Sequence, residues 1–468
     1  MFAKIQRVHF VGIGGIGMSG IAEVLLNLGF RVSGSDLKLN PLTGRLAKMG
    51  ATIQEGHRAE NVRGAEVVVA SSAISASNPE IVEAHRLKVP IIQRGEMLAE
   101  LMRLKYGIAI AGMHGKTTTT SMTAAVLAAG GLDPTVVVGG RVDAMGSNAR
   151  LGKSQYLVAE ADESDRSFLK LSPIISVVTN IDREHMDCYR DMDDVEQTFV
   201  EFMDRVPFYG TVIACVDDAR LRALLPRVSR RVVTYGTAEG TDFRVLDTGL
   251  QSRGSDCLSR FRVRYQGSDL GEFRLHVPGA HNVLNAAAAV AVGVGLDLKL
   301  DDVRAGLETF RGVDRRFQMR GEASGVTVVD DYGHHPTEIR ATLAAARQCG
   351  YQRVLVIFQP HRYTRTQALL EEFGRAFGDA DEVFVLDIYA ASEQPIAGVT
   401  GERVAEAVTN AAGRARYVTS FTEAAEAAAA AASPGDLVLT LGAGNVSQIG
   451  PMVLEKLGAR AAAGAHDK

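Results

Sequence analysis

The sequence has no tryptophan, and its charges almost cancel: 51 Lys and Arg stand against 55 Asp and Glu in 468 residues, a net charge of −4. Proteins that bind nucleic acid usually present a basic face, and binders of single strands add aromatic side chains on which bases stack. Neither feature is indicated here. We therefore expect small-molecule substrates and no nucleic-acid partner.

Cysteine is scarce, and the chain has no Cys-x-x-Cys pair among Cys188, Cys215, Cys257 and Cys349. This spacing predicts neither a disulfide framework nor a thiolate zinc site, and it favours a reducing compartment. No run of about 18 apolar residues occurs, and residues 5–12 are typical of a strand rather than of a secretion signal. We expect a cytoplasmic protein with no membrane partner.

Length and composition predict about three domains, at roughly 150 residues per domain. Strand-like runs alternate with helical runs in the first and last parts of the chain, which indicates parallel strands joined by crossover helices. We predict an α/β fold with an N-terminal Rossmann-like domain (1–105), a central P-loop ATPase-like parallel sheet with a smaller β-rich part (106–313) and a C-terminal Rossmann-like domain (314–468). In the last domain we expect one helix over Thr366–Phe377 and a packed alanine-rich helix over Glu423–Ala432.

A phosphate-binding loop is indicated at Ala111–Thr120, which follows an apolar run and precedes a helical pattern. A glycine-rich turn exposes backbone N–H groups, and the helix N-terminus adds partial positive charge. Lys116 can bridge phosphates, and the Thr117 hydroxyl can bind magnesium. The position five before Gly115 is Ile110 rather than glycine, so the loop is a shortened variant. A bound nucleoside triphosphate is expected.

A second glycine-rich loop, Gly12–Gly17, also follows a predicted strand and opens a helix, and Asp36 ends the next predicted strand. This context fits NAD, as in a dehydrogenase, but the same chemistry accepts any pyrophosphate, including that of a nucleotide sugar. A tight strand-to-helix turn without a ligand is the alternative. Two such loops in one chain favour two phosphorylated ligands.

Acidic side chains follow two predicted strands of the central domain. Glu160, Asp162, Glu163 and Asp165 lie where magnesium bound to a triphosphate would sit, although a solvated acidic turn has the same composition. His185 lies among three further carboxylates after the next predicted strand, which is unusual for a structural histidine.

Two further junctions carry polar residues. Asn282 lies at a helix start, either as an N-cap or as a nucleotide contact. Arg362 and Arg365 follow a predicted strand of the last domain, and they could hold a carboxylate through paired hydrogen bonds or lie in a solvated loop.

Eight segments, in order along the chain, resemble the Mur ligase family: His9–Ala22, Ser71–Ile74, Gly112–Thr120, Glu160–Leu169, Thr179–Tyr189, Gly279–Ala286, Asp330–Glu338 and Gln359–Thr366. The resemblance implies an ATP-dependent amide ligation in peptidoglycan synthesis. The lactyl carboxylate of UDP-N-acetylmuramate would attack the γ-phosphate of ATP, and the amine of L-alanine would then displace phosphate from the acyl phosphate. The three domains would bind the uridine nucleotide, ATP and the amino acid, in that order.

The resemblance also assigns residues. Contacts to the UDP substrate would come from Gly14, Gly15, Ile16, Gly17, Asp36, Ser71, Ser72 and Arg94. Contacts to ATP would come from Gly112, Met113, His114, Gly115, Lys116, Thr117, Thr118, His281, Asn282, Asn285, Arg316 and Asp331. Alanine would lie among Tyr332, His334, Arg362 and Arg365. Lys116, Glu160 and His185 would be catalytic, and Mg²⁺, or Mn²⁺ in its place, would bind Thr117, Glu160 and His185, with Glu163 as the alternative to Glu160.

One departure from the family concerns a second metal. Several relatives place a carbamylated lysine about fifteen residues beyond the metal-binding histidine, but no lysine lies between Lys170 and Lys299 here. Glu196 and Glu201 are the hypothetical substitutes, because they already carry the charge that carbamylation would supply.

Three other functions compete with this interpretation. A ligase that attaches a recycled tripeptide to the same UDP sugar would share most motifs, although the run Asp162–Leu169 favours the addition of alanine. An NAD-dependent dehydrogenase leaves Gly112–Thr120 unexplained, and a non-catalytic nucleotide switch leaves the arginines unexplained. The sequence is compatible with a monomer or a homodimer.

Overall fold

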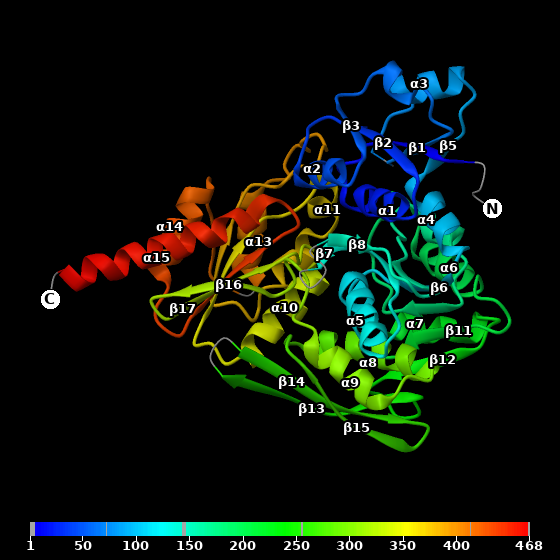
Figure 1. Ribbon diagram of the computed structural model, residues 1–468. Coiled ribbons are helices and arrows are strands. Elements are labelled where there is room, and N and C mark those ends of the chain that lie inside the picture. Colours follow the sequence, from blue (N-terminus) through cyan, green and yellow to red (C-terminus); the bar gives the residue numbers. More distant parts are fainter. Residues whose placement is uncertain (1–4, 72, 143–146, 254–255, 412, 467–468) are drawn as a thin grey trace. The chain divides into compact units, whose positions relative to one another are not determined.

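The computed structural model describes residues 5–71, 73–142, 147–253, 256–411 and 413–466, and Figure 1 labels their helices and strands. The chain forms two compact units. One comprises residues up to Leu246 with Arg262–Phe273 and Leu284–Phe310, and the other comprises Asp247–Phe261, Arg274–Val283 and Arg311 onward. In the described residues, no helix is both long and apolar enough to cross a membrane.

The N-terminal sheet has the order β3-β2-β1-β4-β5, and every neighbouring pair is parallel. Its strands are β1 (Arg7–Val11), β2 (Arg31–Asp36), β3 (Thr52–Glu55), β4 (Val67–Ala70) and β5 (Ile91–Gln93). Its helices are α1 (Ile16–Asn27), α2 (Pro41–Lys48), α3 (Pro79–Arg86) and α4 (Arg94–Met102). The strand order reverses direction next to β1, so the loop after β1 lies at the point where such sheets bind nucleotides.

The central sheet has the order β15-β14-β13-β12-β11-β10-β6-β9-β7-β8. Its strands are β6 (Tyr106–Ala111), β7 (Thr135–Val142), β8 (Ser147–Arg150), β9 (Tyr156–Glu160), β10 (Ile175–Val178), β11 (Thr211–Cys215), β12 (Val232–Gly236), β13 (Phe243–Arg253), β14 (Asp256–Tyr265) and β15 (Ser268–Leu275). Strand β6 lies between β10 and β9, parallel to both, so the segments that follow these three strands share one edge of the sheet. That edge receives both predicted acidic segments.

The helices of the central part are α5 (Lys116–Ala129), α6 (Met192–Met203), α7 (Ala219–Leu224), α8 (Ala280–Gly295) and α9 (Leu300–Thr309). Helices α5 and α9 lie side by side (Figure 1). A Cβ atom on Gly306 would come within 2.6 Å of the Val126 Cα atom, so only glycine permits this approach.

The last sheet has the order β16-β17-β21-β18-β19-β20, parallel except for β16 at its edge. Its strands are β16 (Gln318–Ala323), β17 (Val326–Asp331), β18 (Val354–Phe358), β19 (Glu382–Val385), β20 (Ala415–Tyr417) and β21 (Leu437–Leu441). The helices are α10 (Pro336–Gln348), α11 (Tyr363–Ala368), α12 (Leu370–Gly374), α13 (Gly401–Ala411), α14 (Phe421–Ala431) and α15 (Ile449–His466). Alternate residues of β18 enter different cores: Val354 and Val356 pack with α10, whereas Leu355 and Ile357 pack with α14 and α15.

The predicted α/β class with parallel sheets is confirmed, and the bounds of the three predicted domains stay predictions. The alanine-rich helix is α14, which buries Ala424 and Ala428. The single helix expected over Thr366–Phe377 is wrong: it is divided at Leu369, whose φ of −122° lies outside the helical range. The Sγ atoms of Cys257 and Cys349, distant in sequence, lie 2.7 Å apart as thiols.

Candidate active site

Glycines shape the phosphate loop between β6 and α5. Gly112 and Gly115 have φ values of +129° and +84°, a region that favours glycine. A Cβ atom on Gly115 would lie 2.7 Å from Asn285 Oδ1, and one on Gly112 would collide with Thr179 Oγ1. The loop therefore accepts no side chain at either position, and the departure from the standard spacing still produces a tight strand-to-helix turn.

The segment after β10 braces this loop from outside. The His114 N–H donates to Asn180 Oδ1 at 2.9 Å, and the His114 carbonyl accepts from Thr179 Oγ1 at 2.7 Å and from Asn180 Nδ2 at 2.9 Å. The Met113 N–H donates to the Asn180 carbonyl at 3.3 Å. The predicted ATP contacts Met113 and His114 thus use their N–H groups within the protein. The first turn of α5, starting at Lys116, has N–H groups without intrahelical acceptors, and these remain suited to an anion.

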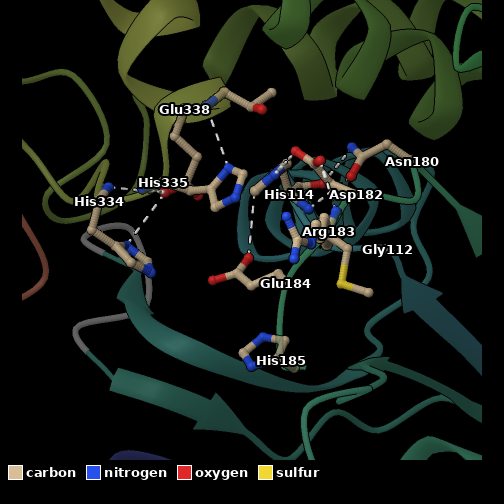
Figure 2. A network of polar contacts seen from close by, with 12 residues as sticks. Gly112, His114, Asn180, Asp182, Arg183, Glu184, His185, His334, His335 and Glu338 are labelled. Carbon is tan, nitrogen blue, oxygen red and sulfur yellow. Dashed lines mark hydrogen bonds and ion pairs between the residues drawn. The ribbon is translucent and has the colours of Figure 1, made fainter. Parts of the chain in front are cut away.

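The side chain of His114 is oriented as well. Its Nε2 lies 2.9 Å from Asp182 Oδ2, and its Nδ1 lies 4.0 Å from Glu184 Oε2. Figure 2 shows His114 facing Asp182 and Glu184, with Asn180 beside the same loop. Asn180 and Asp182 lie in Thr179–Tyr189, one of the segments that resemble the family, but the sequence predicts no role for either residue.

Lys116 lies against a buried carboxylate. Its Nζ donates to Glu163 Oε1 at 2.7 Å and to the carbonyl of Gly112 at 2.7 Å. Burial raises the pKa of Glu163 to about 7, although the charge of Lys116 opposes this shift. His185, which has a left-handed φ of 56°, places Nε2 3.5 Å from the same oxygen. Strained backbone at a non-glycine residue is typical of functional positions.

Glu160 and Glu163 both have oxygens suited to a cation. In the described residues, Glu160 Oε1 and Glu163 Oε2 are buried and accept no hydrogen bond. A buried carboxylate oxygen without a donor is costly, and a bound metal ion is one way to satisfy it. Glu160 ends β9, and Glu163 lies in the turn that follows it. Glu196 and Glu201 are engaged elsewhere, the first with Arg220 at 3.3 Å and the second with Gln197 at 3.2 Å.

The N-terminal glycine-rich loop is held by its own neighbours. The Gly14 N–H donates to Asp36 Oδ2 at 2.8 Å, and Asn40 Nδ2 donates to the Gly14 carbonyl at 3.1 Å. Gly15 caps the first turn of α1, which contains the half-exposed Ile16. Asp36 thus supports the loop with its carboxylate, and Asn40 is a supporting residue that the sequence did not single out.

Three other residues of this domain are predicted to bind the UDP substrate. Ser71 follows β4, and its N–H donates to the Val11 carbonyl. Ser72 lies outside the described residues. Arg94 donates to Asp162 Oδ2 at 2.6 Å, next to the carboxylates around Lys116. Burial opposes ionisation of Asp162, but Arg94 and Ser164 outweigh it and lower the pKa of this carboxyl.

Helix α8 begins at Ala280, so Asn282 lies within the first turn and is not the N-cap. Its Nδ2 donates to the Pro278 carbonyl at 2.7 Å. His281 is buried, and burial together with the nearby Arg316 charge lowers its pKa to about 4. Asn285 meets the phosphate loop at Gly115, as described above.

Asp331 organises the turn after β17. Its carboxylate accepts the N–H groups of Phe317 and Gly333, both at 2.7 Å, and burial raises its pKa to about 6 despite these bonds and the nearby Arg316 charge. Arg316 also lies 3.4 Å from Glu338. Figure 2 shows Glu338 with His334 and His335, whose N–H groups it accepts at 3.0 and 3.3 Å.

Aromatic rings connect the residues predicted to bind alanine. Tyr332 and His334 pair edge to face at 5.3 Å, and His334 pairs with His361 at 5.6 Å. His361 stacks on Tyr389, and its Nδ1 lies 3.1 Å from Arg365. Arg362 is the N-cap residue of α11 and has a φ of +68°. His361 lies in Gln359–Thr366, one of the segments that resemble the family. Tyr389 lies outside all of these segments and follows a different strand, β19.

Together these features define the class of the protein, an α/β enzyme with a tight glycine-rich turn before α5 and a second glycine-rich loop before α1. The chain belongs to the Mur ligase family. It matches the Mur ligase family catalytic domain over residues 7–106, the Mur ligase middle domain over 110–293, and the Mur ligase glutamate ligase domain over 315–444.

Curated relatives match nearly the whole chain. A UDP-N-acetylmuramate–L-alanine ligase of Koribacter versatilis is 69% identical over 98% of this chain and 99% of its own length. One from Acidobacterium capsulatum is 64% identical over the same shares of the two chains. The solved UDP-N-acetylmuramate–alanine ligase of Thermotoga maritima superposes with a TM-score of 0.81 at 31% identity, covering 97% of this chain and 99% of that one.

Proposed function

We propose that this chain joins L-alanine to the lactyl carboxylate of UDP-N-acetylmuramate, with conversion of ATP to ADP and phosphate, in peptidoglycan precursor synthesis. The observation that carries the proposal is the match of 69% identity to a relative of that activity over 98% of the chain. The position of Lys116 at the end of the phosphate loop, bonded to Glu163, supports the proposal, because the transfer of a phosphoryl group needs a cation at this position.

The reaction has two steps. A carboxylate oxygen attacks the γ-phosphorus, the bond to ADP breaks, and an acyl phosphate forms. The uncharged amine of alanine then attacks the acyl carbon, loses a proton, and expels phosphate as the amide forms. Water must be excluded between the steps, because it would hydrolyse the acyl phosphate.

The residues of this chain supply charge and position. Lys116 stabilises the transferred phosphoryl group, assisted by the N–H groups at the start of α5. Since Lys116 is bonded to Glu163 and to the carbonyls of Gly112 and Met113, the γ-phosphate must replace part of this set. In the C-terminal domain, Arg362 and Arg365 bind the carboxylate of alanine, since guanidinium groups pair well with carboxylates.

Magnesium fits the donors near Lys116. Thr117, Glu160 and His185 would hold it, and Glu163 is the alternative carboxylate. The fit rests on the buried oxygens of Glu160 and Glu163 that lack a donor among the described residues. When bound, the ion neutralises charge on the phosphate oxygens. Mn²⁺ has the same ligand preference and could replace it.

Further proposals concern the cellular location, the partners and the oligomeric state of the protein. A nucleotide-linked precursor and ATP are cytoplasmic compounds, so we place the reaction in the cytoplasm. Only small molecules are needed as partners. Sedimentation of the purified chain distinguishes the monomer from the homodimer.

An ADP-release assay tests the proposal. The purified enzyme is given ATP, Mg²⁺ and UDP-N-acetylmuramate, with L-alanine, glycine, L-serine or the recycled tripeptide. ADP release with L-alanine at a catalytic efficiency at least tenfold above the tripeptide is expected. Preference for the tripeptide would assign the recycling activity instead. NADH binding without binding of the UDP sugar would exclude the ligase.

A further inference from the structure

The start of α4 lies between the two glycine-rich loops. Arg94 is its first residue, and a Cβ atom on Gly17 would come within 3.1 Å of the Arg94 side chain. On its other side, the guanidinium of Arg94 donates to Asp162 Oδ2 at 2.6 Å. Asp162 directly precedes Glu163, the carboxylate bonded to Lys116. The Arg94 side chain therefore lies beside the first loop and is bonded to the residue that precedes Glu163, the partner of Lys116.

The acceptor of this bond is itself held in place. Asp162 Oδ1 accepts the Ser164 N–H at 3.1 Å and the Ser164 hydroxyl at 2.6 Å, and the Asp162 carbonyl accepts the Phe168 N–H at 3.0 Å. Ser167 also packs closely on the α4 backbone, because a Cβ atom on Gly95 would collide with the Ser167 side chain. A shift of α4 would thus be felt by the turn that carries Glu163.

We propose that Arg94 and Asp162 form a positioning pair, which holds the loop for the UDP substrate at a fixed separation from Lys116 and its carboxylates. The inference rests on the proposed function, since a ligase must bring the carboxylate of one substrate to the γ-phosphate of the other. Reacting atoms must approach to about 3–3.5 Å, and a misplacement of about 1 Å can cost about 100-fold in rate.

A contribution to folding stability explains the Arg94–Asp162 pair less well than the positioning role does. The side chains of Arg94 and Asp162 are 23% and 36% exposed, so water partly screens the ion pair and reduces its contribution to folding. The other alternative is that Arg94 binds the UDP substrate directly, as its position beside Gly17 also allows. The two roles differ in one respect: a direct contact does not need Asp162, whereas a positioning pair fails in the same way when either partner is lost.

A double-mutant cycle separates these roles. Arg94→Ala, Asp162→Ala and the double variant are compared with the full-length enzyme by ADP release with ATP, UDP-N-acetylmuramate and L-alanine. Each single change should lower kcat about 10- to 100-fold, with the KM for ATP within about twofold, because the phosphate loop keeps its own braces. The double variant should be no slower than the slower single variant. Arg94→Gln and Asp162→Asn serve for the same cycle if an alanine variant fails to fold.

A neighbouring ion pair provides the matched control. Lys170 Nζ lies 3.2 Å from Glu96 Oε2, with side chains 44% and 43% exposed, and it joins α4 to the 3-10 turn Ser167–Lys170. Glu96→Gln and Lys170→Gln should keep kcat within about twofold. An equal loss of kcat in these controls would overturn the inference in favour of general packing between the two elements.

Two further outcomes would also overturn it. Losses that multiply in the double variant would show that Arg94 and Asp162 act independently. Weaker binding of the UDP sugar in Arg94→Ala, with Asp162→Ala normal, would make Arg94 a direct ligand. If the unmodified enzyme released no ADP with alanine, the proposed function would fail; an active enzyme with an additive cycle would refute the positioning pair alone.

Discussion

Replacement of Glu80 by glutamine should destabilise the N-terminal sheet. Glu80 is buried in the first turn of α3. Its Oε2 accepts from Ser35 Oγ at 2.6 Å and lies 3.4 Å from His9 Nε2, and its Oε1 accepts from Asn61 Nδ2 at 2.5 Å. Burial opposes ionisation, but these contacts outweigh it and lower the pKa of Glu80 from 4.5 to about 2. The network connects β1, β2 and α3.

The sign of the effect follows from the two pKa values. Because the pKa of Glu80 is lower in the folded protein, ionised Glu80 stabilises the fold above pH 4.5, and this contribution is lost as the pH falls towards 2. The difference between the two pKa values corresponds to a stabilisation of about 3 kcal/mol at pH 7 and about 1 kcal/mol at pH 3. Glutamine keeps one acceptor but no charge, so the cost of Glu80→Gln should be about 2 kcal/mol larger at pH 7 than at pH 3.

Native-state hydrogen exchange of the β1 and β4 amides measures this cost, because a multidomain chain need not unfold in one step. Glu83→Gln is the control: it lies on the same helix, but its partner Arg86 is exposed, so exchange should be unchanged. Equal destabilisation by Glu80→Gln at both pH values would refute the reasoning. So would exchange in Glu80→Gln that matches the Glu83 control.

The remaining predictions concern turnover. Lys116→Ala should lower kcat by at least about 100-fold, while the affinity for the UDP sugar, measured by calorimetry, should stay within twofold. Loss of UDP-sugar binding in a folded variant would contradict the proposal that ATP and the UDP sugar bind at different loops. Glu163→Gln should raise the Mg²⁺ concentration for half-maximal turnover. Glu196→Gln should leave that concentration unchanged, since Glu196 is paired with Arg220. A higher Mg²⁺ requirement in Glu196→Gln alone would make Glu196, and not Glu163, the metal-binding carboxylate. Arg365→Ala should raise the KM for alanine about tenfold or more, and an unchanged KM would remove Arg365 from the site.

Local features of this fold were predictable from the sequence. Glycines at Gly112 and Gly115 indicate a tight turn because their backbone angles exclude side chains, and the alternation of strands and helices indicates parallel sheets. Strand order was not predictable in detail. The division of the helix at Leu369 has no proline or glycine to mark it, so propensity favoured one continuous helix.

Within the candidate site, the sequence identified segments better than individual side chains. Asn180 and Asp182 brace the phosphate loop because β10 lies next to β6, and this adjacency is a property of the sheet rather than of either segment. Tyr389 reaches His361 for a similar reason, since it follows β19, the neighbour of β18. Contacts between segments distant in sequence depend on strand order, which hydrophobic patterns do not encode.

The acidic residues of the central part of the chain show the same limit. Charge and spacing alone made Glu196 and Glu201 reasonable substitutes, but both lie on α6 with partners of their own. Glu163, three residues beyond Glu160 on the turn after β9, contributes a second buried carboxylate oxygen without a donor among the described residues. Because Lys116 Nζ lies 2.7 Å from the other oxygen, Oε1, the two oxygens of Glu163 have different surroundings, and no pattern of charge and spacing in the sequence indicates that difference.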